Sequence, residues 1–151
     1  MRKIDRRQAL VIAAGAAVLA AVPFAVAPAL AANDTAEVVK AFLAGREPVK
    51  GKLTVELPEI AENGNTVPLA LTVDSPMTEA SHVTEVVVLA EANPTSNIAK
   101  FRFTPSSGKV DITLRVRLSA TQNVFVLAKT NDGAVYMEKK LVKVTIAGCG
   151  G

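Results

Sequence analysis

The chain has 151 residues, 17 of them Lys or Arg and 14 Asp or Glu, and its formal net charge is +3. That length predicts one domain with a hydrophobic core. The positive charge lies entirely in the first 31 residues, so the remainder carries 13 basic and 13 acidic residues. With no Trp and one Tyr, it lacks the basic surface and the stacking rings that nucleic-acid or acidic-membrane partners require. A single cysteine also excludes an internal disulfide.

The first segment, residues 1–31, has the pattern of a cleaved export signal. A basic head precedes an apolar run over residues 9–22, and small residues with Ala-x-Ala spacing end at Ala31, where we expect cleavage. The run is rich in alanine and is followed by prolines, which disfavours a retained membrane anchor. Arg6 and Arg7 precede the run and resemble the twin-arginine signal of bacteria, although they also fit the positive head of a general secretory signal. The predicted location is the periplasm.

A short amphipathic helix is predicted over residues 35–44. Asn33 or Asp34 can cap its start, and Gly45 can end it. Its apolar face is formed by Val38, Val39, Phe42 and Leu43. We expect this helix to cover the open end or one face of the structure that follows.

From residue 48 onward the hydrophobic pattern has a period of two, which is typical of strands. The predicted strands cover residues 52–57, 66–73, 82–92, 98–103, 110–118, 123–130 and 134–146. The connections between them, including "PEIAENGN" at residues 58–65, contain turn residues and are too short for crossover helices. About seven strands of this kind predict an all-β fold, an antiparallel two-sheet sandwich over residues 32–146.

Three local features sharpen this prediction. In the strand at residues 110–118 the odd positions are charged or polar and the even positions apolar, so a slip of one residue would bury Arg115 and Arg117. Pro68 indicates an edge position or the start of a strand. The turn around residues 131–133 resembles a tight hairpin in which Gly133 supplies a positive φ.

Catalytic motifs are absent from the sequence. It has one histidine, His82, and neither a Cys-x-x-Cys pair, an HExxH motif, a glycine-rich phosphate loop nor a nucleophile elbow. A lone imidazole cannot build a metal site, so we expect His82 to be an exposed or edge histidine without a catalytic role and predict no metal or cofactor. The acidic residues stand singly, as Glu56, Glu59 and Glu62 illustrate.

The only cysteine, Cys149, stands among glycines near the C-terminus. Its neighbours in the tail, Ala147, Gly148, Gly150 and Gly151, cannot bury it, so we expect an exposed thiol on a flexible arm. Three extended residues beyond the last strand reach about 10 Å, enough to enter a cleft in another protein. An unperturbed thiol has a pKa of about 8.5, and the nearby terminal carboxylate disfavours the thiolate. These features are typical of an attachment point for a carried group more than of an enzyme's nucleophile. Alternatively, the cysteine is incidental and forms a disulfide-linked homodimer.

Together these passages resemble a known family. The twin-arginine-like signal, "ENGNTVPLALTVDSPMT", "FRFTPSSG", "TQNVFVLAKTNDG" and the ending "AGCGG" are similar to SoxY, the sulfur-carrying subunit of periplasmic thiosulfate oxidation. Members of that family typically end Gly-Gly-Cys-Gly-Gly, and Ala147 replaces the first glycine here. The resemblance implies an immunoglobulin-like sandwich and assigns covalent substrate attachment to Cys149.

The same resemblance implies partners. These are a SoxZ-like subunit in a heterodimer, a c-type cytochrome that joins thiosulfate to the cysteine, a hydrolase that releases sulfate and, where present, a sulfane dehydrogenase. The carrier itself would not be an enzyme. Two alternatives remain open: a non-carrying binding module of immunoglobulin-like fold, and a carrier that uses the Gly151 carboxylate, as ubiquitin-like proteins do.

Overall fold

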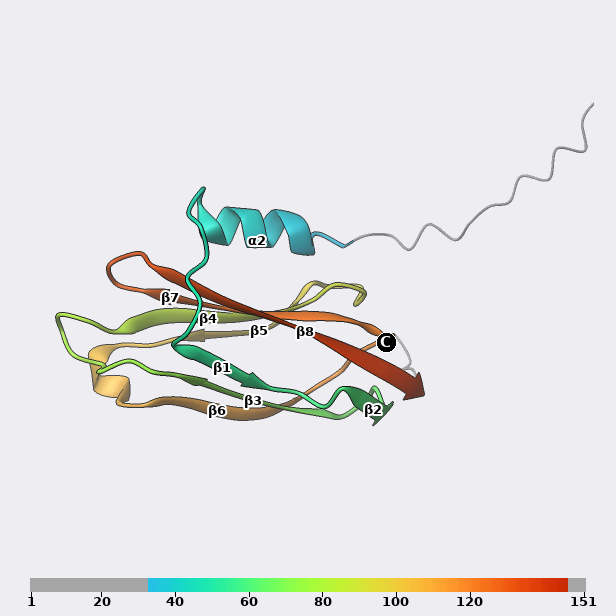
Figure 1. Cartoon of the computed structure of the whole chain (residues 1–151). Helices are drawn as coiled ribbons and strands as arrows, with labels where there is room; N and C mark the ends of the chain where they lie inside the picture. Colours follow the sequence, from blue (N-terminus) through green and yellow to red (C-terminus); the bar gives the residue numbers. More distant parts are fainter. Residues whose placement is uncertain (1–32, 147–151) are drawn as a thin grey trace, which may run out of the picture.

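Two β-sheets pack face to face, and a helix lies on the outer side of one of them (Figure 1). The structure is a computed structural model that describes residues 33–146. The elements are α2 Thr35–Leu43, β1 Leu53–Glu56, β2 Ile60–Asn63, β3 Val67–Val73, β4 Val83–Ala90, β5 Asn97–Arg102, the 3-10 helix η1 Pro105–Ser107, β6 Val110–Val116, β7 Gln122–Thr130 and β8 Val135–Ile146.

The smaller sheet has the strand order β1-β3-β6, and the larger has β2-β8-β7-β4-β5. All neighbouring strands are antiparallel except β2 and β8, which pair in parallel. This architecture confirms the predicted all-β, immunoglobulin-like sandwich with a short N-terminal helix.

The main core lies between the two sheets, and strand β6 shows how the sequence directs side chains into it. Val110 and Val116 are buried, whereas Asp111 and Arg115 are exposed. Val116 lies opposite Val67 of β3 in the antiparallel register. The predicted alternation in this strand is therefore confirmed, and its charged positions face away from the core.

Helix α2 covers the outer face of the larger sheet. Its apolar face packs against a second buried cluster from β4, β7 and β8, formed by Val87, Leu89, Leu127 and Val135. At the start of the helix, the Asn33 Oδ1 atom accepts hydrogen bonds from the Thr35 backbone N–H (3.2 Å) and hydroxyl (2.6 Å). The helix ends at Leu43, one residue earlier than predicted, because Ala44 already has a left-handed backbone with φ 49°. Of the two predicted roles, covering one face is confirmed.

The hairpin between β7 and β8 forms as predicted. The Thr130 N–H donates to the Ala134 carbonyl (3.0 Å), and the Gly133 N–H donates to the Thr130 carbonyl (2.9 Å). Gly133 has φ 85°, a value that few residues other than glycine adopt without strain. This turn sets the register of the two longest strands.

Pro68 is the second residue of β3 and pairs with Arg115 of β6. Strand β1 pairs with β3 only from Ala70 onward, so Pro68 lies beyond the segment that β1 covers. The position at the start of a strand is the correct one of the two predicted.

The prediction for residues 58–65 needs a correction, because this connection contains the eighth strand, β2. It pairs with the end of β8, with Ile60 opposite Lys143 and Ala61 opposite Val144. Only Ala61 is buried in β2, so the strand shows no clear alternation in sequence. Pairing with a distant part of the chain, rather than local pattern, makes these residues a strand.

Candidate functional site

The residues predicted to carry function all lie outside the described range of 33–146. These are Cys149 with its neighbours Ala147, Gly148, Gly150 and Gly151, and the signal residues Arg6 and Arg7. The structure describes the chain up to Ile146, three residues before Cys149. The end of β8 from which the predicted arm starts, residues 143–146, lies within the described range and forms the arm base.

On one side, the end of β8 is held by β2 and the residues around it. The Lys143 N–H donates to the Glu59 carbonyl (2.8 Å), and the Gly64 N–H donates to the Ile146 carbonyl (2.9 Å). Between them, the Thr145 hydroxyl donates to the Glu62 carbonyl (3.0 Å). Hydrogen bonds thus follow this edge of β8 to its last residue.

On the other edge of β8, strand β7 begins only at Gln122, so beyond this residue a side chain supplies the hydrogen bond in place of the β7 backbone. The Val144 N–H donates to the Thr121 hydroxyl oxygen (3.0 Å). This contact satisfies a backbone donor that β7 does not reach. The end of β8 is therefore held by hydrogen bonds on both edges.

The loops at this end of the sandwich are joined through the buried side chain of Asn93. Its Nδ2 donates to the Arg117 carbonyl (2.8 Å), and its Oδ1 accepts from the Ser119 N–H (3.0 Å) and from Gln122 Nε2 (2.9 Å). The Asn33 side chain donates to the Asn93 carbonyl (2.7 Å). The start of α2 and the end of β8 consequently lie at the same end of the molecule, on the right in Figure 1.

Among the described residues, the carboxylate of Asp132 and the ammonium group of Lys109 have displaced pKa values, and both lie away from Ile146. A hydrogen bond from the Thr130 hydroxyl, helped by the Ala134 N–H, holds the pKa of Asp132 below its ordinary value in the β7–β8 hairpin. A hydrogen bond with Asp111 raises the pKa of Lys109. Neither shift bears on a reactive group at the arm base.

His82 lies near the same hairpin. Its Nδ1 atom is 3.0 Å from the Thr78 carbonyl, and its backbone N–H donates to Asn131 Oδ1 (3.1 Å). Within residues 33–146 no group of three His, Cys, Asp or Glu side chains is arranged to hold a metal ion. No helix of this described part is long and apolar enough to cross a membrane.

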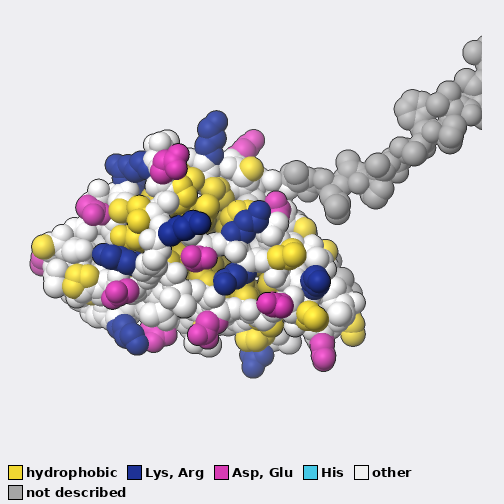
Figure 2. Space-filling view, viewed as in Figure 1, with side chains coloured by type: hydrophobic (Ala, Val, Ile, Leu, Met, Phe, Trp, Pro, Cys, Tyr) yellow, Lys and Arg dark blue, Asp and Glu magenta, His cyan; other side chains and the backbone are white. Residues whose placement is uncertain are grey.

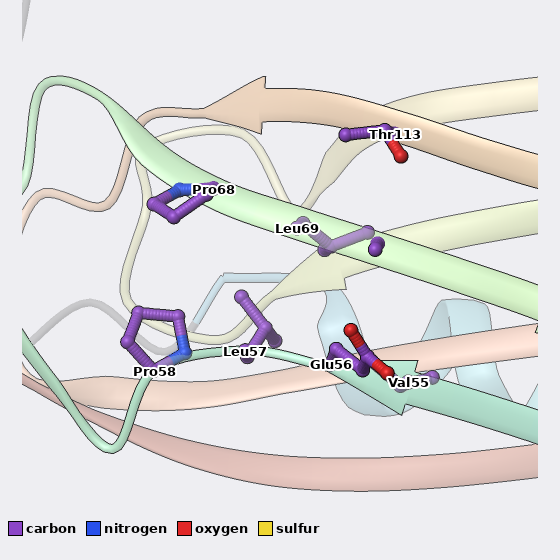
Figure 3. A pocket seen from close by; sticks show the side chains of 8 residues that line it. Val55, Glu56, Leu57, Pro58, Pro68, Leu69 and Thr113 are labelled. Carbon is purple, nitrogen blue, oxygen red and sulfur yellow. The ribbon is translucent and has the colours of Figure 1, made fainter.

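A hollow of about 460 Å³ lies where β1 ends and the chain turns away from β3. Figure 3 shows Leu57 and Pro58, which follow β1, across from Pro68 on β3, with Thr113 on β6 beyond. The other lining residues are Val55, Glu56, Leu69 and Ala70. Apart from the carboxylate of Glu56 and the hydroxyl of Thr113, this lining is apolar, so the hollow offers no set of groups for catalysis.

The sequence missed the residues that hold the arm base. Thr121 and Asn93 lie in segments predicted as simple connections, and β2 lacks an alternating pattern. Polar residues in loops are common, so no local signal marks Thr121 as a partner of the β8 end or Asn93 as the residue that joins the loops beside it. Only their position in the folded chain shows this role.

The chain is a small two-sheet β-sandwich protein. Several solved structures have a similar fold. The sulfur carrier protein SoxY from Chlorobium limicola f thiosulfatophilum is 30% identical with a TM-score of 0.58, and the match covers 74% of this chain and 98% of that one. A superoxide reductase (neelaredoxin) from Ignicoccus hospitalis is 17% identical with a TM-score of 0.55, covering 62% and 80%. A variant of that reductase is 18% identical with a TM-score of 0.56, covering 68% and 85%. The likeness to the reductases shows the fold alone.

A family model described as sulfur oxidation protein SoxY matches residues 39–149, and this match ends at Cys149. No curated protein sequence matches the chain. Since the family model covers well over half of its length, the chain belongs to the SoxY family.

Proposed function

We propose that this protein is a covalent sulfur carrier in thiosulfate oxidation and that Cys149 is the attachment point. The observation that supports this most is the family match, which ends at the only cysteine of the chain. That cysteine follows three residues after a strand end held by hydrogen bonds on both edges. The carrier arm of the proposal is Ala147, Gly148, Cys149, Gly150 and Gly151.

A fixed base and a short arm suit a carrier. If extended, the residues from Ile146 to the thiol span about 10 Å, so the cargo can enter an active site while the sandwich stays outside. Small residues beside the cysteine leave few side chains to fit into each cleft. Different enzymes can then act on the same sulfur atom without a specific pocket on the carrier.

The proposed chemistry takes place in the partner enzymes. A c-type cytochrome accepts an electron pair while the Cys149 thiolate forms an S–S bond with the outer sulfur of thiosulfate. A hydrolase then adds water to the terminal sulfone group, which leaves as hydrogen sulfate with release of a proton, and a persulfide anion remains on Cys149. In organisms with a sulfane dehydrogenase, that persulfide sulfur is oxidised further.

The same proposal includes location and assembly. Residues 1–31, with Arg6 and Arg7, direct export to the periplasm through the twin-arginine route and are removed after Ala31. Residues 32–146 form the sandwich, which pairs with a SoxZ-like subunit. Export in the folded state would carry a bound subunit that lacks a signal of its own.

The experiment that tests this proposal is thiosulfate-dependent cytochrome reduction by a reconstituted system of the partner enzymes. Cys149→Ser replaces the thiol by a hydroxyl of similar size, and we expect it to abolish turnover. A matched control places a thiol elsewhere: Ser106→Cys in the Cys149→Ser background adds an exposed cysteine on η1, at the end of the sandwich opposite Ile146 (Figure 1). This double variant should remain inactive.

Other outcomes favour the alternatives. Unchanged turnover with Cys149→Ser would support a non-carrying binding module. Activity restored by Ser106→Cys would mean that any exposed thiol suffices and that the arm has no special role. Modification mapped to the Gly151 carboxylate would support the ubiquitin-like alternative.

A further inference from the structure

One edge of β8 is open in the middle and closed at both ends. Near the start, the Val49 N–H donates to the Val135 carbonyl (2.8 Å), and Val49 forms an isolated parallel bridge with Tyr136. Pairing on this edge resumes only where β2 begins, with Ile60 opposite Lys143. Between these points the chain leaves β8 to form β1 in the other sheet (Figure 1).

The register shows which backbone groups face this opening. In an antiparallel pair, alternate residues exchange both hydrogen bonds with the partner strand, and those between them point to the opposite edge. The hydrogen bond from the Thr130 N–H to the Ala134 carbonyl shows that the backbone N–H and C=O groups of the even-numbered residues of β8 point toward β7. The N–H and C=O groups of Lys139 and Leu141 therefore face the open edge, where no other described residue pairs with them.

Apolar side chains are exposed around the same opening. Leu141 is 53% exposed within it, and Val49 (45%) and Ile60 (58%) stand at its two ends. These are three of the four exposed large hydrophobic residues of the described chain. An unpaired strand edge with apolar neighbours is the structure to which an extended segment of another protein adds as a further strand.

The charges around the opening indicate what kind of segment fits. Lys139, Lys140 and Lys143 line a hollow there together with Ile60, Leu141 and a single acidic residue, Glu59. Figure 2 shows Lys and Arg side chains, interspersed with hydrophobic and some acidic ones, across the middle of the face that β8 crosses. Edge lysines disfavour pairing with uncharged or basic strands, and they attract a strand that carries carboxylates.

We infer that the open edge of β8 between Tyr136 and Lys143 is a docking site for a short, extended, acidic segment of a partner protein. The segment adds beside β8 through backbone hydrogen bonds to Lys139 and Leu141. Its apolar side chains contact Leu141 and Ile60, and its carboxylates face the lysines. From Met137 to Leu141 the strand rises about 13 Å, so the site takes roughly four or five residues.

A second copy of the chain fits this opening poorly. Val49 and β2 close it at both ends in the plane of the sheet, so a long edge strand from another sandwich would meet them. A short free segment avoids this obstruction. The inference does not depend on sulfur carrying, because it rests on the sheet edge alone.

The test uses a capped hexapeptide of alternating glutamate and valine, added to the protein as isolated, with hydrogen exchange of each amide followed by NMR. We expect exchange at the Lys139 and Leu141 amides to slow by about tenfold or more near saturation. Two control peptides share its length: one with lysine in place of glutamate, and one N-methylated at alternate residues so that it cannot form a ladder. Neither should protect these amides.

Variants complete the test. Leu141→Glu adds an exposed negative charge within the opening, and the double variant Lys139→Glu with Lys143→Glu reverses the charge beside it; each should weaken peptide binding by about tenfold or more. Lys40→Glu, a charge reversal at an exposed position of α2, should leave binding unchanged. The inference is wrong if these two amides gain no protection, if the control peptides act equally, or if protection appears at another sheet edge. Protection that rises with protein concentration without peptide would assign the edge to a second copy and overturn the acidic partner.

Discussion

The backbone N–H of Gly64 donates to the carbonyl of Ile146 across 2.9 Å, which connects the turn after β2 to the residue where β8 ends. The two residues are far apart in sequence, so the base of the proposed arm depends on a long-range contact. Gly64 also accepts a hydrogen bond from the Leu118 N–H (2.7 Å), and this joins the smaller sheet to the same point. The arm base is thus supported by both sheets.

Detaching β2 should loosen this base without unfolding the sandwich. Ala61 is buried against β8, so Ala61→Glu would place a charged side chain where there is neither water nor a partner. We expect hydrogen exchange at the Lys143 and Gly64 amides to rise by about tenfold or more, while the Leu127 amide in β7 changes little.

The neighbouring Glu62 provides the control for this prediction, because its side chain is exposed on the same strand. Glu62→Ala should leave both amides protected. Equal loosening by the two substitutions would show that β2 does not depend on its buried side.

Asn93 is predicted to be the most sensitive polar residue at this end. Asn93→Ala would leave the Arg117 carbonyl and the Ser119 N–H without partners, which should lower the free energy of unfolding by about 2–3 kcal/mol. Urea denaturation monitored by circular dichroism measures this loss. Asn97→Ala, at an exposed position, should change the same quantity by no more than about 0.5 kcal/mol. If the two variants are equally stable, the Asn93 network does not hold these loops.

Leu127 and Val126 are adjacent in β7, but their side chains lie on opposite faces of the sheet. Each therefore belongs to a different buried cluster. Leu127 packs beneath α2, whereas Val126 lies between the sheets. Leu127→Ala should cost about 2–5 kcal/mol and Val126→Ala somewhat less, because fewer buried atoms are removed. Only Leu127→Ala should speed exchange at the Ala44 amide, which bonds to Lys40 in the helix, beyond the effect of global destabilisation. Equal effects of both variants on that amide would contradict the assignment of α2 to the outer face.

Asp132 should make the hairpin sensitive to acid. Its pKa in the folded protein is lowered, chiefly by the Thr130 hydroxyl and then by the Ala134 N–H, whereas an unfolded aspartate has a pKa of about 3.9. A depressed pKa means that the carboxylate stabilises the fold above about pH 4 and that this contribution is lost as pH falls through the folded-state pKa.

Asp132→Asn should therefore show a smaller decrease in stability than the parent chain when pH is lowered below about 4. Urea midpoints measured across this acidic range give the comparison. A parallel decrease in both proteins would mean that the carboxylate of Asp132 contributes nothing to the pH dependence.

Much of the fold follows from local pattern, as strand β6 and the Gly133 turn illustrate. In β6, alternation between apolar and charged residues defines the buried side, and Gly133 is one of few residues suited to its φ of 85°. Strand β2 could not be predicted in this way, since it has one buried residue and becomes a strand only beside β8. The same reason explains why Thr121 and Asn93 were missed: their role depends on which distant segments meet.

For the candidate site, too, one part could be predicted from sequence and another part could not. Cys149 was predicted from its position among small residues, which is a property of sequence alone. The hydrogen-bond partners of the β8 end come from separate segments, at Glu59, Glu62, Gly64 and Thr121, and sequence spacing does not show that these segments meet there. The order of strands in the larger sheet was equally beyond local pattern, because it is decided by pairing over long separations.

The most direct test of the central claim is the intact mass of the protein isolated from the periplasm of thiosulfate-grown cells, measured with and without reductant. The proposal predicts reductant-labile additions of a thiosulfate group or of whole sulfur atoms, mapped to Cys149 and absent from Cys149→Ser. Only unmodified protein or a plain disulfide dimer, found while thiosulfate is being oxidised, would contradict covalent sulfur carrying.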